Sequence, residues 1–120
     1  MIQGIGIDLI ELNRIQKNIN HNEQRFIDRI LTVNEREVYN SLTGEMRKVE
    51  FLAGRFAAKE AYAKAIGTGI GKLSFQHIEI LPNDLGAPMM MVQSSTEYKI
   101  FISITHSKEY AVAQVVIEDK

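Results

Sequence analysis

The segment that most constrains the fold of this chain runs from Phe51 to Ile66 and is followed by Gly67-Thr68-Gly69. Alanine is the strongest helix former, so this alanine-rich segment is predicted to be a helix. Glycine tolerates the left-handed conformation in which many helices end, and the helix is therefore expected to stop at Gly67. Because apolar residues occupy most of its sides, the helix is expected to be largely buried.

Four charged side chains interrupt the apolar surface of this helix. Arg55 and Lys59 share one stripe, and Glu60 and Lys64 share a second, because residues four apart lie on the same side of a helix. The simplest interpretation of Glu60 and Lys64 is a surface ion pair worth about 0.2–0.5 kcal/mol. The alternative is a carboxylate that holds a metal ion next to a lysine that faces phosphate.

Length and composition limit the class of protein. The 120 residues carry a net charge of −1 and contain no cysteine. We expect one domain, residues 1–120, with a single core. The near-neutral charge argues against binding nucleic acid or a membrane surface, and the missing cysteines exclude disulfides and thiolate metal sites. The chain has no apolar run of membrane-spanning length and no signal-peptide pattern, so the cytoplasm is the expected compartment.

The order of the expected elements indicates an α+β fold. A strand over 1–9 is followed by a helix with Leu12, Ile15 and Ile19 on one face, and the capping box Thr32-Val33-Asn34-Glu35 opens a helix through about Leu42. After the long helix, we expect an antiparallel meander with strands at 76–81, 88–92, 100–105 and 110–117.

Two glycine-containing motifs look like nucleotide-binding loops but do not fit one. Gly4-Ile5-Gly6 follows a strand, yet the third glycine of a dinucleotide fingerprint would fall at Leu9. Gly67-Thr68-Gly69-Ile70-Gly71 follows a helix and does not open one, so it cannot place a pyrophosphate at that helix's N-terminus. Both motifs are better interpreted as glycines that the backbone geometry requires.

Asp8 stands at the end of the first strand and has two interpretations. It could cap the helix that follows. If it instead points toward Glu60, two carboxylates meet, and they stay ionised together at low cost only with a cation between them. Oxygen ligands without cysteine or clustered histidine favour Mg²⁺, which usually takes one or two protein carboxylates and completes its shell with water and substrate phosphate. Lys64 would then neutralise that phosphate.

The third candidate is His106 in Ser103-Ile104-Thr105-His106-Ser107, where a strand meets a turn. It is either an ordinary turn residue or a donor to phosphate or ribose. Nucleophilic catalysis by the neighbouring serines is not expected, because no GxSxG elbow or triad order accompanies them.

Taken together, these blocks resemble the holo-acyl-carrier-protein synthases, the small bacterial 4′-phosphopantetheinyl transferases. The order, the spacing and the chain length all fit, with Phe56 standing where the family often has tryptophan. The matching blocks are Gly4-Ile5-Gly6-Ile7-Asp8-Leu9-Ile10-Glu11, the stretch from Arg55 to Gly69, and Ser103-Ile104-Thr105-His106-Ser107.

The resemblance implies an antiparallel sheet packed on a long central helix in a compact homotrimer. It implies Mg²⁺-dependent transfer of the phosphopantetheine arm of coenzyme A to a serine of apo-acyl carrier protein, for fatty acid biosynthesis, with adenosine 3′,5′-bisphosphate leaving. Asp8 and Glu60 match the metal-binding acids and Lys64 the lysine at the phosphates, and these three form the catalytic set. The active sites lie between subunits, which allows Asp8 and Glu60 to meet across an interface. The resemblance completes the coenzyme A site with Arg55, Gly67, Thr68, Gly69 and His106.

Two further points stay open from sequence. Glu60, acting through a water on the metal, is the preferred general base. Acyl carrier protein is strongly acidic, so the basic face formed by Arg14, Lys17, His21 and Arg25 is either its docking surface or a solvated polar face. A rival function is a non-catalytic module that binds coenzyme A or carrier protein, in which Glu60 and Lys64 form only a salt bridge.

Overall fold

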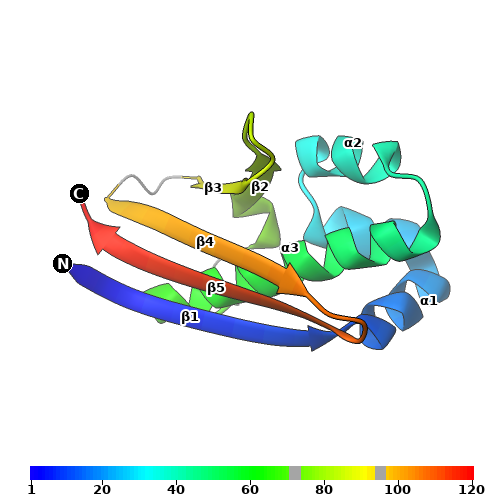
Figure 1. Ribbon diagram of the computed structural model, residues 1–120, viewed down its shortest axis with the longest axis horizontal. Helices are drawn as coiled ribbons and strands as arrows, with labels where there is room; N and C mark the ends of the chain where they lie inside the picture. The colour runs from blue at the N-terminus through cyan, green and yellow to red at the C-terminus, as the bar shows by residue number, and fades with distance from the viewer. Residues whose placement is uncertain (71–73, 94–96) are drawn as a thin grey trace.

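The computed structural model of the protein describes residues 1–70, 74–93 and 97–120. Gly71, the last glycine of the second motif, lies outside these residues. In chain order the elements are β1 (Ile2–Glu11), α1 (Leu12–Ile30), α2 (Val33–Ser41), α3 (Glu45–Ile66), the 3-10 helix η1 (Phe75–His77), β2 (Ile78–Pro82), β3 (Pro88–Val92), β4 (Tyr98–His106) and β5 (Tyr110–Asp119) (Figure 1).

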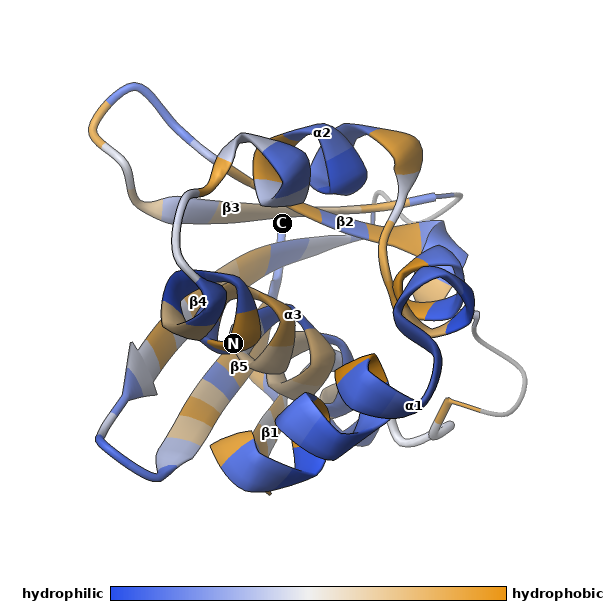
Figure 2. Cartoon of the chain, turned by 90° about the vertical axis from the view of Figure 1, so that its right-hand side faces the viewer, coloured by the Kyte–Doolittle hydropathy of each residue, from blue (hydrophilic) through white to orange (hydrophobic). Residues whose placement is uncertain are grey.

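The strands form an antiparallel three-stranded sheet, in the order β1-β5-β4, and a separate two-stranded ribbon, β2-β3. The α+β class is therefore confirmed, and so are the antiparallel pairs β2-β3 and β4-β5. The expected single meander is wrong, because the two pairs do not join in one sheet and β1 adds to the far side of β5. Helix α3 runs along one face of the sheet (Figure 1). Figure 2 shows α3 between the sheet, α1 and the layer of α2 with the ribbon. Among the described residues, no helix is long and apolar enough to cross a membrane.

The local helix signals are confirmed. Thr32 and Glu35 form the expected capping box at the start of α2. Helix α3 is 22 residues long, starts at Glu45, earlier than Phe51, and ends at Gly67, whose φ of 82° is left-handed. Strand β2 starts at Ile78 because the preceding residues form η1.

Strand β1 differs from the short buried strand expected at the N-terminus. It spans 10 residues and continues past Asp8 to Glu11, so α1 begins at Leu12 and Asp8 does not cap it. Capping by Asp8 is therefore wrong. Gly4, Gly6 and Asp8 face α3, while Ile5, Ile7 and Leu9 point away from it and are 61%, 58% and 59% exposed. One face of β1 is thus packed and the other is an uncovered apolar stripe.

The two glycines of β1 allow the backbones of β1 and α3 to touch. A Cβ atom at Gly4 would lie 2.0 Å from the carbonyl oxygen of Ala65, and one at Gly6 would lie 1.8 Å from that of Ala61. No side chain fits at these distances, and helix backbone cannot move aside as a side chain can. The interpretation of Gly4 and Gly6 as residues required by the backbone is confirmed.

A buried ion pair joins α3 to the rest of the helical layer. Lys59 Nζ lies 2.6 Å from Glu35 Oε1, and both side chains are fully buried. Lys59 also donates to the carbonyl oxygens of Ile30 and Phe75, at 2.7 and 3.1 Å. Glu35 in turn accepts from the backbone N–H groups of Thr32 and Ile80. Each charge is therefore fully hydrogen-bonded, as a buried pair requires.

We expect Gly6→Ala to destabilise the fold by about 3 kcal/mol or more, because the new methyl group would meet only backbone atoms. Gly54→Ala is the matched control. Its Cβ would meet only the Cγ2 methyl of Ile104, at 3.0 Å, and alanine favours a helix interior. Urea unfolding of both variants measures the difference. Equal stability of the two variants would show that the contact between β1 and α3 can relax.

Candidate active site

One half of the site forms where β1 packs on α3, and we call it the acidic half; it consists of Asp8, Glu60 and Lys64. Lys64 Nζ donates to Asp8 Oδ1 and to the carbonyl oxygen of Ile7, both at 3.0 Å. In the described part of the chain, the ion-pair partner of Lys64 is thus Asp8 and not Glu60, so the expected surface pair of Glu60 with Lys64 is wrong. The side chain of Asp8 is mostly buried, whereas that of Lys64 remains half exposed and open to a ligand.

Glu60 lies close enough to Asp8 for the two carboxylates to repel each other. Partial burial raises the pKa of Glu60, and the negative charge of Asp8 raises it further. The positive charges of Lys64, Arg14 and Arg29 act on this pKa in the opposite direction. The two acids therefore lie within electrostatic reach of each other in one chain, and no subunit interface is needed to bring them near each other. A cation between them would relieve the repulsion.

A groove of about 620 Å³ opens beside Glu60, between α1 and α3. Arg14 and Lys17 line it, and a neighbouring groove along α1 is lined by His21 and Arg25. All four residues of the expected basic face therefore follow one side of α1, and they are exposed. Helix α1 has a kink at Asn22 within this stretch, with φ −162° and ψ 89°. Phe26 and Arg29, which sequence reasoning did not single out, line both grooves.

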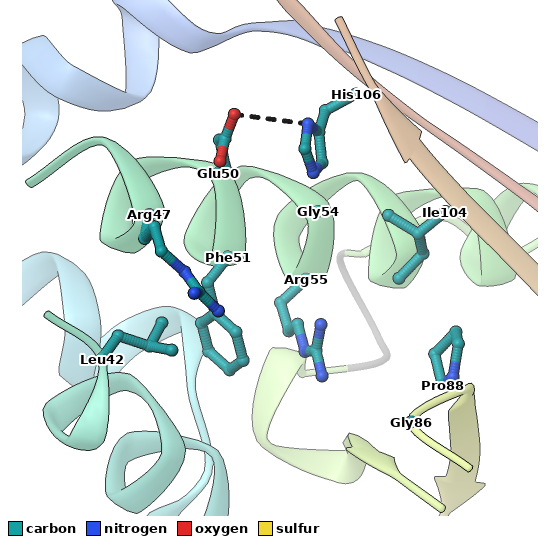
Figure 3. Close-up of a pocket in the computed structure, with 10 residues that line it drawn as sticks. All are labelled: Leu42, Arg47, Glu50, Phe51, Gly54, Arg55, Gly86, Pro88, Ile104 and His106. Atoms are coloured by element: carbon teal, nitrogen blue, oxygen red, sulfur yellow. Dashed lines mark ion pairs between the residues drawn. The ribbon is translucent and has the colours of Figure 1, made fainter. Parts of the chain in front are cut away.

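His106 belongs to a different pocket, of about 380 Å³, lined by α3, the end of β4 and the β2-β3 turn (Figure 3). Its Nδ1 atom lies 3.3 Å from Glu50 Oε2. Arg47 and Arg55 also line this pocket. The Arg55 guanidinium stacks on the ring of Phe51 at 4.1 Å, and its Nε has no hydrogen-bond partner among the described residues. Burial lowers the pKa of Arg55, and the charge of Glu35 partly opposes this effect.

The structure does not bring the acidic half and the His106 pocket together in one chain. Asp8 lies on β1 and His106 on β4, which are the two edges of the sheet with β5 between them. Adjacent strands are about 4.8 Å apart, so roughly 10 Å of sheet separates the two halves. Gly67-Thr68-Gly69 begins where α3 ends, three residues after Lys64, and Ala65 of that last turn packs against Gly4, so this segment lies on the acidic side.

A divalent cation would find two protein ligands here. The part of the chain that the structure describes contains no group of three or more acidic, histidine or cysteine side chains placed to hold a metal. Asp8 and Glu60 offer carboxylate oxygens, and their repulsion is the kind that a cation relieves. A pair of carboxylates with open positions for water and phosphate suits Mg²⁺.

Comparisons with known proteins identify the class to which this fold and site belong. Residues 4–115 match the model of the 4′-phosphopantetheinyl transferase superfamily. The chain belongs to this superfamily. The match begins at the first glycine of β1 and extends into β5, so it includes both halves of the candidate site.

Individual relatives narrow the family. The chain is 59% identical over 120 residues to the holo-[acyl-carrier-protein] synthase of Oceanobacillus iheyensis, covering 100% of this chain and 99% of the relative. The crystal structure of the Bacillus anthracis synthase in complex with CoA (3′,5′-ADP) is similar at a TM-score of 0.91 and 57% identity, covering 100% and 99% of the two chains. The crystal structure of the Neisseria meningitidis synthase is similar at a TM-score of 0.88 and 36% identity, covering 99% of this chain and 100% of the other. Within the superfamily the chain is thus a member of the holo-[acyl-carrier-protein] synthases, as its sequence motifs indicated.

Besides Phe26, sequence reasoning missed three charged residues that line the pockets, which are Arg29, Arg47 and Glu50. Helical spacing could have indicated two of them, because Arg47, Glu50 and Gly54 follow one another on α3 at intervals of three and four residues. Arg29 follows Arg25 at the same spacing on α1.

We expect Glu60→Gln to stabilise the metal-free protein at neutral pH. The folded-state pKa of Glu60 lies above its unfolded value, so the wild type loses stability as the pH rises through that interval. Glutamine does not ionise, and the two proteins should converge below about pH 4, where the carboxyl is protonated in both states. Melting temperatures across this pH range test the idea, with the exposed Glu37→Gln as control. A Glu60→Gln variant that is no more stable at neutral pH would contradict it.

Proposed function

We propose that this chain, acting as one domain of residues 1–120, transfers the 4′-phosphopantetheine arm of coenzyme A to a serine of apo-acyl carrier protein. The observation that carries the proposal is the meeting of Asp8, Glu60 and Lys64, in a chain that belongs to this family of synthases. The reaction joins the serine Oγ to the β-phosphorus and breaks its bond to the oxygen of the leaving adenosine 3′,5′-bisphosphate. Its setting is fatty acid biosynthesis in the cytoplasm.

Asp8 and Glu60 would hold Mg²⁺, which when bound neutralises charge on the diphosphate of coenzyme A. The half-exposed ammonium of Lys64 is free to turn from Asp8 toward the same phosphates. Glu60, acting through a water, would be the preferred base for the serine Oγ proton.

The His106 pocket would bind the remaining phosphate and the nucleotide. Arg47, Arg55 and His106 place cationic or donor groups around it. Gly67, Thr68 and Gly69, which extend from α3 next to Lys64, would line the nucleotide from the acidic side.

A homotrimer would bring the two halves together. The acidic half lies at the β1 edge of the sheet and the His106 pocket at the β4 edge, so the acidic half of one subunit can face the pocket of the next. Such a contact between two different surfaces closes into a ring when the rotation allows it. The outward stripe of Ile5, Ile7 and Leu9, together with exposed Phe101 on β4, supplies an apolar surface for the contact.

We expect Asp8→Asn and Glu60→Gln each to reduce transfer by about a thousandfold while folding is retained. Each variant removes a carboxylate that would hold Mg²⁺, and with it the positive charge that stabilises the transition state. Mass spectrometry of acyl carrier protein incubated with coenzyme A, with and without Mg²⁺, measures the added phosphopantetheine arm. Wild-type protein should add it only with Mg²⁺. Binding of coenzyme A without any mass gain on the carrier would indicate a non-catalytic module. Near wild-type turnover of either variant would refute the metal assignment.

The basic face of α1 would dock the acidic carrier protein. We expect Arg14→Glu to raise the KM for carrier protein about tenfold, with little effect on the KM for coenzyme A, because a rim charge acts mainly on the charged partner. Lys120→Glu makes the same change of charge at the exposed C-terminus and should alter neither KM. Initial-rate kinetics in both substrates measure the effect. Equal changes in both KM values for Arg14→Glu would contradict docking.

A further inference from the structure

The His106 pocket contains one acidic residue among cationic ones. Glu50 lies near the start of α3 and lines the same pocket as Arg47, Arg55 and His106. A carboxylate next to a phosphate is repulsive, so a pocket for the phosphates of coenzyme A should exclude it. The presence of Glu50 therefore requires a physical account.

The geometry supplies one. Glu50 and His106 turn toward each other from α3 and from the end of β4, on the side of α3 away from the guanidinium groups of Arg47 and Arg55 (Figure 3). Glu50 Oε2 lies 3.3 Å from His106 Nδ1, and the Glu50 side chain is 26% exposed against 49% for His106. The more exposed ring is thus held by the less exposed carboxylate.

This contact determines what the other ring nitrogen can do. When Nδ1–H donates to Glu50, the Nε2 atom of a neutral ring carries only a lone pair. It then has no hydrogen to donate to a phosphate oxygen. The cationic ring presents N–H groups at both nitrogens and can donate to Glu50 and to a phosphate oxygen at once. The negative charges of Glu50 and the phosphate then stabilise the cation between them.

We propose that Glu50 is a positioning residue, which holds His106 so that Nε2–H points to a phosphate of coenzyme A. The proposal rests on the function proposed above. The repulsion between Glu50 and the phosphate is offset as long as the imidazolium lies between them. Without the ring, the same carboxylate is an unpaired negative charge in an anion-binding pocket.

A double-mutant cycle of Glu50→Gln and His106→Ala tests this directly, with the KM for coenzyme A and the Kd for adenosine 3′,5′-bisphosphate as readouts. In the wild-type background, Glu50→Gln should weaken both about tenfold, because a charge-assisted hydrogen bond becomes a neutral one. In the His106→Ala background, the same substitution should strengthen binding, because it removes the unpaired carboxylate. The KM for carrier protein should stay within twofold of its starting value in either background, which is roughly the precision of such comparisons.

The effect of Glu50→Gln on ligand binding should thus change sign between the two backgrounds, and this change distinguishes a positioning residue from other roles. A Glu50 that contacts the nucleotide itself, or that only supports the fold, would weaken binding by similar factors in both backgrounds, and this result would overturn the proposal. So would an unchanged KM for coenzyme A in the wild-type background. Glu37→Gln, an exposed carboxamide substitution on α2 that does not line the pocket, is the matched control. If wild-type protein transfers no phosphopantetheine, the proposed function fails, whereas an active wild type without sign reversal refutes the role of Glu50 alone.

Discussion

The backbone contact between β1 and α3 is the constraint on which the acidic site depends. Gly4 and Gly6 bring the strand so close to Ala61 and Ala65 that no side chain fits between them. Because successive residues of a strand alternate in direction, Asp8 then faces the helix as the glycines do. From there its carboxylate pairs with Lys64 and lies within electrostatic reach of Glu60. A glycine pattern that resembles a nucleotide loop thus serves to position a carboxylate.

Helix α3 carries charges of two kinds, and burial separates them. Lys59 is buried and donates hydrogen bonds to Glu35 and to two backbone carbonyl groups, which connect α3 to the end of α1 and to η1. Glu60 and Lys64, the next charges along the helix, stay accessible and are the charges to which we assign the chemistry of the site. The buried pair fixes the orientation of the helix, and that orientation decides which charges reach the ligand. Rigid support of this kind is what a site based on charge placement requires.

Local signals in the sequence predicted the local structure well. The capping box at Thr32 and the end of α3 at Gly67 depend on neighbouring residues only, and both are as expected. Contacts between distant segments were not predictable in the same way. The partner of Lys59 is 24 residues away, and that of Lys64 is 56 residues away, so helical spacing pointed to the wrong neighbour for Lys64. The family pattern brought the acids together but gave no sign that a single chain holds both.

A closed site requires two chains in this account, with Glu60 supplied by one subunit and His106 by the next. The most direct test mixes Glu60→Gln and His106→Ala proteins, each strongly impaired alone, by unfolding and refolding them together. Random assembly of a cyclic trimer leaves about a quarter of the sites with both functional halves, so the mixture should regain about a quarter of wild-type transfer. A refolded mixture no more active than its components would contradict the shared site.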